Sequence, residues 1–70
     1  MTIGENLKTI REQNGLTQPQ LAKFSRISQQ NISRWELNQI SPNIEFCIIL
    51  ADFYGISIDD LVGHEVKKNW

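Results

Sequence analysis

The chain has 70 residues, of which 40% are apolar and 21% charged, and its formal net charge is −1. A chain of this length forms one small domain and has no room for a second. A single cysteine, Cys47, excludes an intramolecular disulfide, and a single histidine, His64, leaves the usual Cys/His zinc spacings incomplete. Neither a disulfide-stapled secreted scaffold nor a zinc site is therefore expected.

The apolar residues form no run long enough for a signal peptide or a membrane helix, which predicts a cytoplasmic chain without a membrane partner. Charge is uneven along the sequence, since residues 1–40 hold five Lys and Arg against three acidic residues and residues 41–70 hold two against five. This asymmetry allows a basic face on an acidic body, but ordinary solvated charge gives the same counts.

Helix-capping residues recur along the chain. Thr2 and Glu5 fit a capping box that begins a first helix, and Gly15 is placed to end it. Thr17 and Gln20 fit a second capping box two residues later. The first of these helices carries one apolar stripe, formed by Ile3, Leu7 and Ile10. The apolar residues of the second are Leu21, Ala22 and Phe24, of which Leu21 and Ala22 are expected in the core.

Three further helices are predicted in the same way. Ser28 caps a third helix so close behind the second that the two must cross steeply. Asn43 caps a fourth helix over residues 44–54, and Ser57 caps a short fifth that ends near Gly63. Because no alternating, strand-like run is present, we expect an all-α fold, a compact five-helix domain.

The third predicted helix has two distinct faces at 100° per residue. One face holds Ile32, Trp35 and Glu36 and is expected to turn inward, with Trp35 packing in the core. The other face consists of side chains that pair with base edges, because Gln matches adenine, Arg matches guanine and Ser matches several groups; they are Gln29, Gln30, Ser33 and Arg34. A helix face that is merely solvated has the same composition, so the face alone leaves both interpretations open.

Residues 17–36, TQPQLAKFSRISQQNISRWE, resemble the helix-turn-helix of the phage repressor and Cro family, also called the Xre type. Several separated motifs at matching spacing make the resemblance specific. They extend over residues 3–63 and comprise Arg11, Gly15-Leu16-Thr17-Gln18, Leu21-Ala22, Ile27-Ser28, Ile32-Ser33, Trp35-Glu36, Pro42, Leu50-Ala51, Ile56-Ser57 and Leu61.

The resemblance implies a lambda-repressor-like DNA-binding domain over residues 1–63, with the helix-turn-helix at the second and third helices and residues 64–70 as a C-terminal tail. It implies a sequence-specific, double-stranded DNA-binding transcriptional regulator, with repression as the expected mode, in a bacterial or phage-infected cell at the nucleoid. No metal, cofactor or small-molecule ligand is expected. An enzyme is not expected either, because neither Cys47 nor His64 has a catalytic partner in the sequence.

Within that resemblance, the third helix lies in the major groove and its polar face reads bases. Backbone or mixed contacts to DNA are implied for Gln18, Asn38, Gln39, Ser41 and Asn43. Arg11 and Glu36 are implied to form a structural ion pair that does not touch DNA.

Two positions depart from the family pattern. Arg26 stands in the turn between the second and third helices, where the family most often has glycine, and Asn38 replaces a second common glycine. If Arg26 has a positive φ, its side chain adds a steric cost of about 1 kcal/mol. Asn38 is a milder exchange because asparagine tolerates the left-handed region.

The fourth predicted helix is more apolar than one core-facing stripe requires, since Glu45 and Asp52 are its polar residues. Beyond it, apolar residues recur every four positions. They predict a homodimer contact formed by the fifth helix and the tail, with the fourth helix contributing: Ile58, Val62, Val66 and Trp70. Packing of the tail on its own domain is the alternative. A protein-binding module, such as an antitoxin or an anti-repressor partner, is the alternative function for the same apolar surface.

Overall fold

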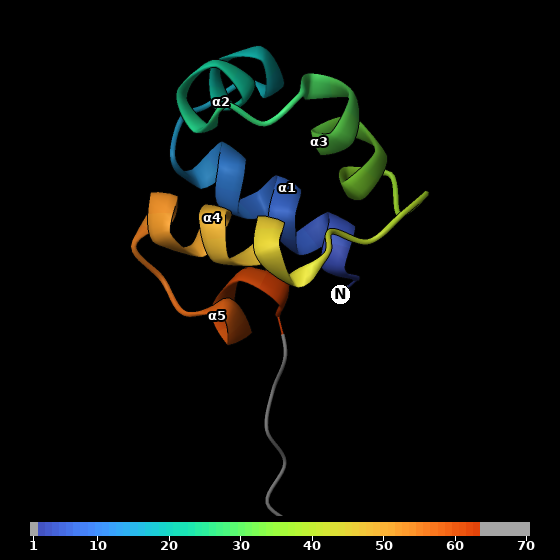
Figure 1. Cartoon of the computed structure of the whole chain (residues 1–70), viewed down its shortest axis with the longest axis vertical. Coiled ribbons are helices and arrows are strands. Elements are labelled where there is room, and N and C mark those ends of the chain that lie inside the picture. The colour runs from blue at the N-terminus through green and yellow to red at the C-terminus, as the bar shows by residue number, and fades with distance from the viewer. Residues whose placement is uncertain (1, 64–70) are drawn as a thin grey trace, which may run out of the picture.

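Five α-helices form the domain in the computed structural model, which describes residues 2–63, and these residues contain no strand (Figure 1). The all-α, five-helix fold predicted from the sequence is confirmed. The helices are α1 (Ile3–Gln13), α2 (Gln18–Ser25), α3 (Gln29–Glu36), α4 (Ile44–Tyr54) and α5 (Ile58–Val62).

Each helix begins at a residue whose side chain accepts a hydrogen bond from the backbone N–H three positions later. This arrangement satisfies one of the amides that the first turn of a helix leaves unbonded, and each such cap stabilises by about 0.5–2 kcal/mol. At α2 the bond is reciprocal, because the Gln20 side chain also accepts from the Thr17 amide at 2.9 Å. All five predicted caps are confirmed: Thr2, Thr17, Ser28, Asn43 and Ser57.

Arg26 and Asn38 both have left-handed backbones, with φ of 61° and 58°. Arg26 closes α2 and directs the chain into the short turn before α3, whereas Asn38 reverses the chain after α3. Each occupies a conformation in which its Cβ crowds a neighbouring carbonyl, and asparagine accepts this more readily than arginine. The departure from glycine at Arg26 is thus a real steric cost in the turn of the helix-turn-helix.

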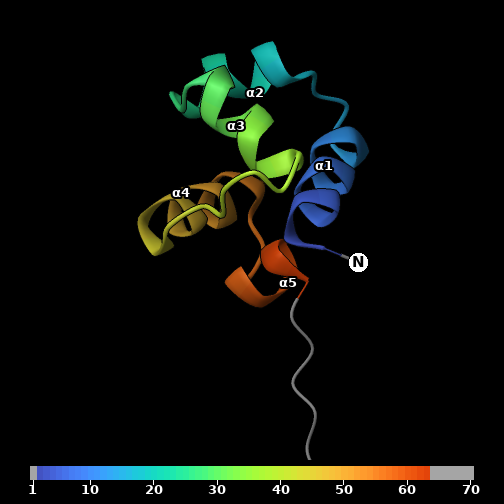
Figure 2. The same ribbon diagram turned by 90° about the vertical axis from the view of Figure 1, so that its right-hand side faces the viewer.

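The five helices pack together around one shared core. Figures 1 and 2 place α2 and α3 together at one end of the domain and α5 at the other, with α1 and α4 between them. α1 packs against α3 and α5, α2 packs against α3 and α4, and α4 packs against α5. Their contacts enclose one core: Leu7, Leu21, Ile27, Ile32, Trp35, Cys47, Leu50, Ala51 and Leu61.

Two apolar residues of α1 and α2 lie outside the core. Phe24 is 58% exposed and Ile3 is 38% exposed. The eight-residue helix α2 buries Leu21 against the domain, whereas Phe24, three residues further along, stays exposed. Trp35 does pack inward as predicted, and its ring centroid lies 5.0 Å from that of Phe46.

Candidate nucleic-acid interface

Helix α3 presents its polar face at the surface of the domain. Gln29, Gln30 and Arg34 are exposed, and Ser33 is half-buried. The opposite face is closed off, because Ile32 is 2% and Trp35 3% exposed. None of the four polar side chains forms a hydrogen bond or ion pair within residues 2–63. They are therefore available to a partner without any internal contact having to break.

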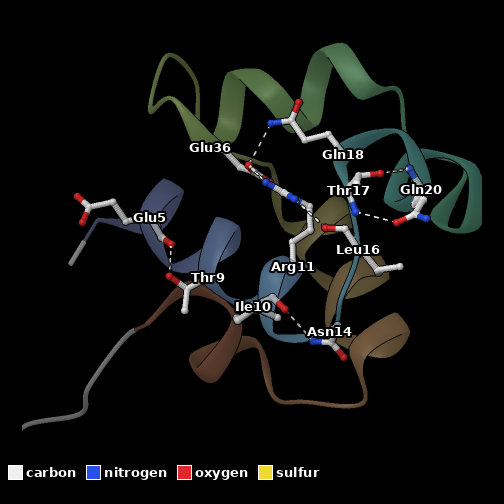
Figure 3. A network of polar contacts seen from close by, with 10 residues as sticks. All are labelled: Glu5, Thr9, Ile10, Arg11, Asn14, Leu16, Thr17, Gln18, Gln20 and Glu36. Atoms are coloured by element: carbon white, nitrogen blue, oxygen red, sulfur yellow. Dashed lines mark hydrogen bonds and ion pairs between the residues drawn. The ribbon is translucent and has the colours of Figure 1, made fainter.

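A buried ion pair fixes α3 to α1. The Arg11 guanidinium donates from Nε to Glu36 Oε2 at 2.7 Å and from Nη2 to Glu36 Oε1 at 2.9 Å, and it donates from Nη1 to the Leu16 carbonyl at 2.7 Å (Figure 3). The two side chains are only 10% and 5% exposed. The hydrogen bond to Glu36 raises the pKa of Arg11 above its usual value. The bidentate geometry fixes the orientation of α3 relative to α1 more than a single contact would.

Gln18 adds a third donor to the same carboxylate. Its Nε2 donates to Glu36 Oε1 at 3.0 Å, so that α2 and α3 are joined by a side-chain contact as well as by their turn (Figure 3). Within residues 2–63, the backbone N–H of Gln18 donates to no acceptor. Pro19 has no N–H, and the backbone N–H of Gln20 donates to Thr17 Oγ1. The first turn of α2 therefore offers one backbone donor to an external anion.

Asn38 uses both ends of its side-chain amide inside the domain. Its Oδ1 accepts from the Gly4 amide at 3.0 Å, and its Nδ2 donates to Thr2 Oγ1 at 3.0 Å. A Cβ at Gly4 would collide with the carbonyl oxygen of Trp35. A residue without a side chain is therefore needed here for the first turn of α1 to lie against the end of α3. The second N–H of Nδ2 makes no bond within residues 2–63, so a phosphate contact through it would leave both of these bonds in place.

The remaining linker residues lie outside the core. Gln39 and Ser41 are exposed. The Oδ1 of Asn43 caps α4 by accepting from the Phe46 amide at 3.0 Å, which directs its Nδ2 away from that helix. These three residues bring neutral donors to the segment that follows α3, and no lysine or arginine lies between Arg34 and Gly63.

The burial of Tyr54 places an unsatisfied hydroxyl near the ion pair. Within residues 2–63 this hydroxyl is buried and has no hydrogen-bond partner. Burial raises the pKa of Tyr54 to about 12, an effect that the nearby Arg11 partly opposes. The hydroxyl belongs to a small cavity that Glu36 and Trp35 also line. Sequence reasoning gave Tyr54 no role.

Comparison with known proteins assigns the fold and site to a family. A family model described as helix-turn-helix matches residues 7–61. The chain belongs to the helix-turn-helix family. Its α2 and α3 are the two helices of the motif, the arrangement that helix-turn-helix proteins use to bind DNA.

This chain is similar to a transcriptional activator, to an antitoxin and to a transcriptional regulator of known structure. The HTH-type transcriptional activator BcrR of Enterococcus faecalis is 35% identical over 65 residues, which cover 93% of this chain and 32% of BcrR. The antitoxin PezA of Streptococcus pneumoniae is 33% identical over 67 residues, which cover 96% of this chain and 42% of PezA. The crystal structure of a transcriptional regulator from Listeria innocua matches with a TM-score of 0.80 and 31% identity, over 97% of this chain and 63% of that one. The chain thus spans less than two thirds of each of these relatives.

Two residues of the expected dimer contact also touch the core of this helix-turn-helix domain. Ile58 and Val62 are half-buried and pack against the core, while Val66 and Trp70 lie outside the described residues. Helix α4 also exposes four apolar side chains by 40–62%: Ile44, Ile48, Ile49 and Phe53.

Within residues 2–63, no helix is both long and apolar enough to cross a membrane. No group of three or more His, Cys, Asp or Glu side chains there is arranged to hold a metal ion.

The Gln18–Glu36 contact and the two bonds of Asn38 were missed from the sequence. Their partners are 18, 34 and 36 residues apart, and no local pattern marks them. The one available signal was Gly4, a glycine inside a predicted helix, which indicates a close approach of another backbone.

Proposed function

We propose that this chain binds a near-palindromic operator in double-stranded DNA as a homodimer and regulates transcription, with α3 in the major groove. The observation that carries the proposal is the polar face of α3, whose side chains reach the surface and make no hydrogen bond within residues 2–63, while the opposite face is buried. A helix of this kind places amide, hydroxyl and guanidinium groups where base edges present their donors and acceptors.

Each polar residue of α3 has a distinct role in this proposal. Gln29 and Gln30 lie in the first turn of α3 and suit adenine, whose N6 and N7 match an amide. Arg34 suits guanine through O6 and N7, and Ser33 adds a shorter donor or acceptor between them. Arg11 and Glu36 maintain the orientation of α3 and make no contact with DNA.

The linker and the first turn of α2 supply the backbone contacts in this proposal. Gln39, Ser41 and Asn43 bring neutral donors to phosphates, and the unbonded amide of Gln18 suits one more. Because a neutral donor releases no counterion, we expect the affinity to depend less steeply on salt than in a lysine-rich domain of this kind. The two-fold axis of the dimer then sets the two α3 helices about 34 Å apart, one helical turn of DNA.

Repression is the mode that the proposal favours, because a dimer that covers an operator excludes other proteins from it. A cytoplasmic site of action at the nucleoid follows from the same DNA partner. The apolar side chains exposed on α4 support a two-copy assembly, since monomers rarely leave such a face uncovered.

Selection of bound sequences from a random DNA pool tests the proposal, because it reports base preference, half-site spacing and symmetry together. Arg34→Ala is expected to relax the preference at one base pair in each half-site by about 1–3 kcal/mol. Lys23→Ala, on an exposed side of α2, is the matched charge control. A loss of affinity by Arg34→Ala that is equal for all sequences would mean that Arg34 contacts phosphate only.

A second candidate function is a protein-binding module. The exposed face of α4 is the observation that favours it, and PezA, a relative of similar identity, carries the name antitoxin. Sedimentation equilibrium at tens of micromolar distinguishes the two functions. A monomer that selects no DNA sequence would favour the protein-binding module, whereas a dimer with a palindromic preference would favour the regulator.

A further inference from the structure

The exposed side of α4 combines acidic and apolar side chains. Glu45 and Asp52 are both exposed and lie close to two helical turns apart, so their carboxylates follow one line along the helix. Within residues 2–63, neither carboxylate forms an ion pair. Exposed apolar side chains flank this line and complete what we call the α4 face: Ile44 and Ile48 on one side, Ile49 and Phe53 on the other.

Two copies of the α4 face do not fit one another. A two-fold axis across two such faces would bring four carboxylates together, those of Glu45 and Asp52 from each copy. Neither α4 nor α5 contains a lysine or an arginine that could separate them. Like charges that face each other across an interface disfavour that pairing. A segment that covers the α4 face must therefore carry cations among apolar residues.

The sequence that follows α5 has this composition. Residues 66–70, VKKNW, lie outside the described residues and contain Lys67 and Lys68, the two cations that follow Arg34 in the chain. Two of the other residues in this segment are apolar, Val66 and Trp70. The segment therefore matches the α4 face in charge and in apolar character.

The segment begins on the α1 side of the domain. Gly63 ends α5 beside α1, since a Cβ at Gly63 would lie 3.2 Å from Cγ of Asn6. Figure 2 shows the end of α5 on the side of α1, with α4 on the other side. The α4 face points away from the core, so the α4 of a second copy is the one that can meet this side. Seven residues span at most about 25 Å and α4 is about 16 Å long, which is sufficient reach.

We propose that residues 66–70 of one copy bind the α4 face of a second copy, and that the reciprocal contact forms by two-fold symmetry. The two lysines pair with Glu45 and Asp52, while Val66 and Trp70 cover the apolar side chains beside them. The inference rests on the proposed function, since it requires the homodimer. It names the surface that the expected dimer contacts of the tail occupy, and it excludes direct pairing of α4 with α4.

Exchange of charges between the tail and α4 tests this contact in the full chain. One variant, Lys67→Glu with Lys68→Glu, has an acidic tail, and a second, Glu45→Lys with Asp52→Lys, has a basic α4 face. Each variant alone sets like charges against each other, so we expect sedimentation equilibrium to show a homodimer dissociation constant that is higher by about tenfold or more. An equimolar mixture makes both contacts complementary, and we expect heterodimers with an affinity close to that of the wild type.

A matched control reverses two exposed charges away from this contact. Lys8→Glu with Lys23→Glu changes α1 and α2 and is expected to keep the wild-type dissociation constant. Either charge-exchange variant dimerising as tightly as the wild type, or a mixture no tighter than the separate variants, would overturn the contact. The proposed function fails separately, if the wild-type chain dimerises but selects no DNA sequence. A wild-type chain that is monomeric at tens of micromolar would overturn both.

Nuclear Overhauser contacts in the wild-type chain test the same proposal without relying on a variant that must fold. In dimers of one isotope-labelled and one unlabelled copy, we expect contacts between copies from the Trp70 indole to the methyl groups of Ile48 or Ile49. Contacts found within one copy alone would show that the tail packs on its own domain and would overturn the proposal. The absence of both kinds of contact would overturn it as well.

Discussion

Replacement of Arg11 by methionine removes two of the three N–H groups that the Glu36 carboxylate accepts within residues 2–63. It also removes the donor to the Leu16 carbonyl, which is bonded at 2.7 Å. The Glu36 side chain is only 5% exposed, so water cannot replace the lost partners without a structural change. Breaking a buried ion pair in this way costs about 3–5 kcal/mol.

That cost is a large part of the free energy of unfolding of a domain of this size. At about 0.05–0.15 kcal/mol per residue, the total free energy of unfolding is on the order of 4–10 kcal/mol. We expect the urea midpoint of Arg11→Met, followed by far-ultraviolet circular dichroism, to fall by 1 M or more, which is about the loss divided by a denaturant slope of 1–3 kcal/mol per molar. Arg34→Met, which removes an exposed arginine from α3, is the matched control and is expected to change stability by less than about 0.5 kcal/mol.

A double replacement separates the charge from the packing. Arg11→Met with Glu36→Leu removes the carboxylate that the single variant leaves buried and unpaired, so we expect it to recover part of the lost stability. If the double variant is no more stable than Arg11→Met, the unpaired charge is not the cause. If Arg11→Met unfolds at the wild-type urea concentration and selects a different operator, the pair is part of the DNA contact and the structural interpretation is wrong.

Three other measurements test separate features of the domain. Tyr54 is the single tyrosine of the chain, so ultraviolet absorbance of the phenolate should give a titration midpoint of about 12 in the folded state. Because the tyrosine of the unfolded chain ionises at about 10, the free energy of unfolding should fall as the pH rises between these two values. A folded midpoint of about 10 would refute the burial argument. Arg26→Gly is expected to raise the free energy of unfolding by up to about 1 kcal/mol because it relieves a left-handed arginine, and a lower urea midpoint would contradict this. Gly4→Ala is expected to lower the free energy of unfolding by about 1–3 kcal/mol, since the new Cβ meets the Trp35 carbonyl. An unchanged urea midpoint would show that the first turn of α1 shifts freely.

Local signals in the sequence predicted the helices accurately. Capping by Thr17 or Asn43 depends on residues within one turn, and the left-handed backbone of Asn38 depends on its own side chain. The exposure of Phe24 was not predictable in the same way, because Leu21 and Phe24, three residues apart, share a helix face and the packing of neighbouring elements decides which of them is buried.

The same distinction between local signals and tertiary packing applies to the candidate site. The outward face of α3 followed from its helical period, and the expected roles of Gln29 and Arg34 came from the family resemblance. The Gln18 side chain was expected to contact DNA, but its bond to Glu36 depends on how α2 and α3 cross. That crossing angle is a tertiary property, and no residue pattern within 17–36 specifies it.

The attachment of α3 to α1 at Glu36 and again just beyond it, at Asn38, has a mechanical consequence. A recognition element clamped in two places moves as one stiff unit and adjusts little to an imperfect target. The double helix must then supply the deformation, through steps that kink or compress at low energetic cost. Flexible pyrimidine–purine steps between the half-sites are therefore expected to tighten binding, even though no side chain touches them.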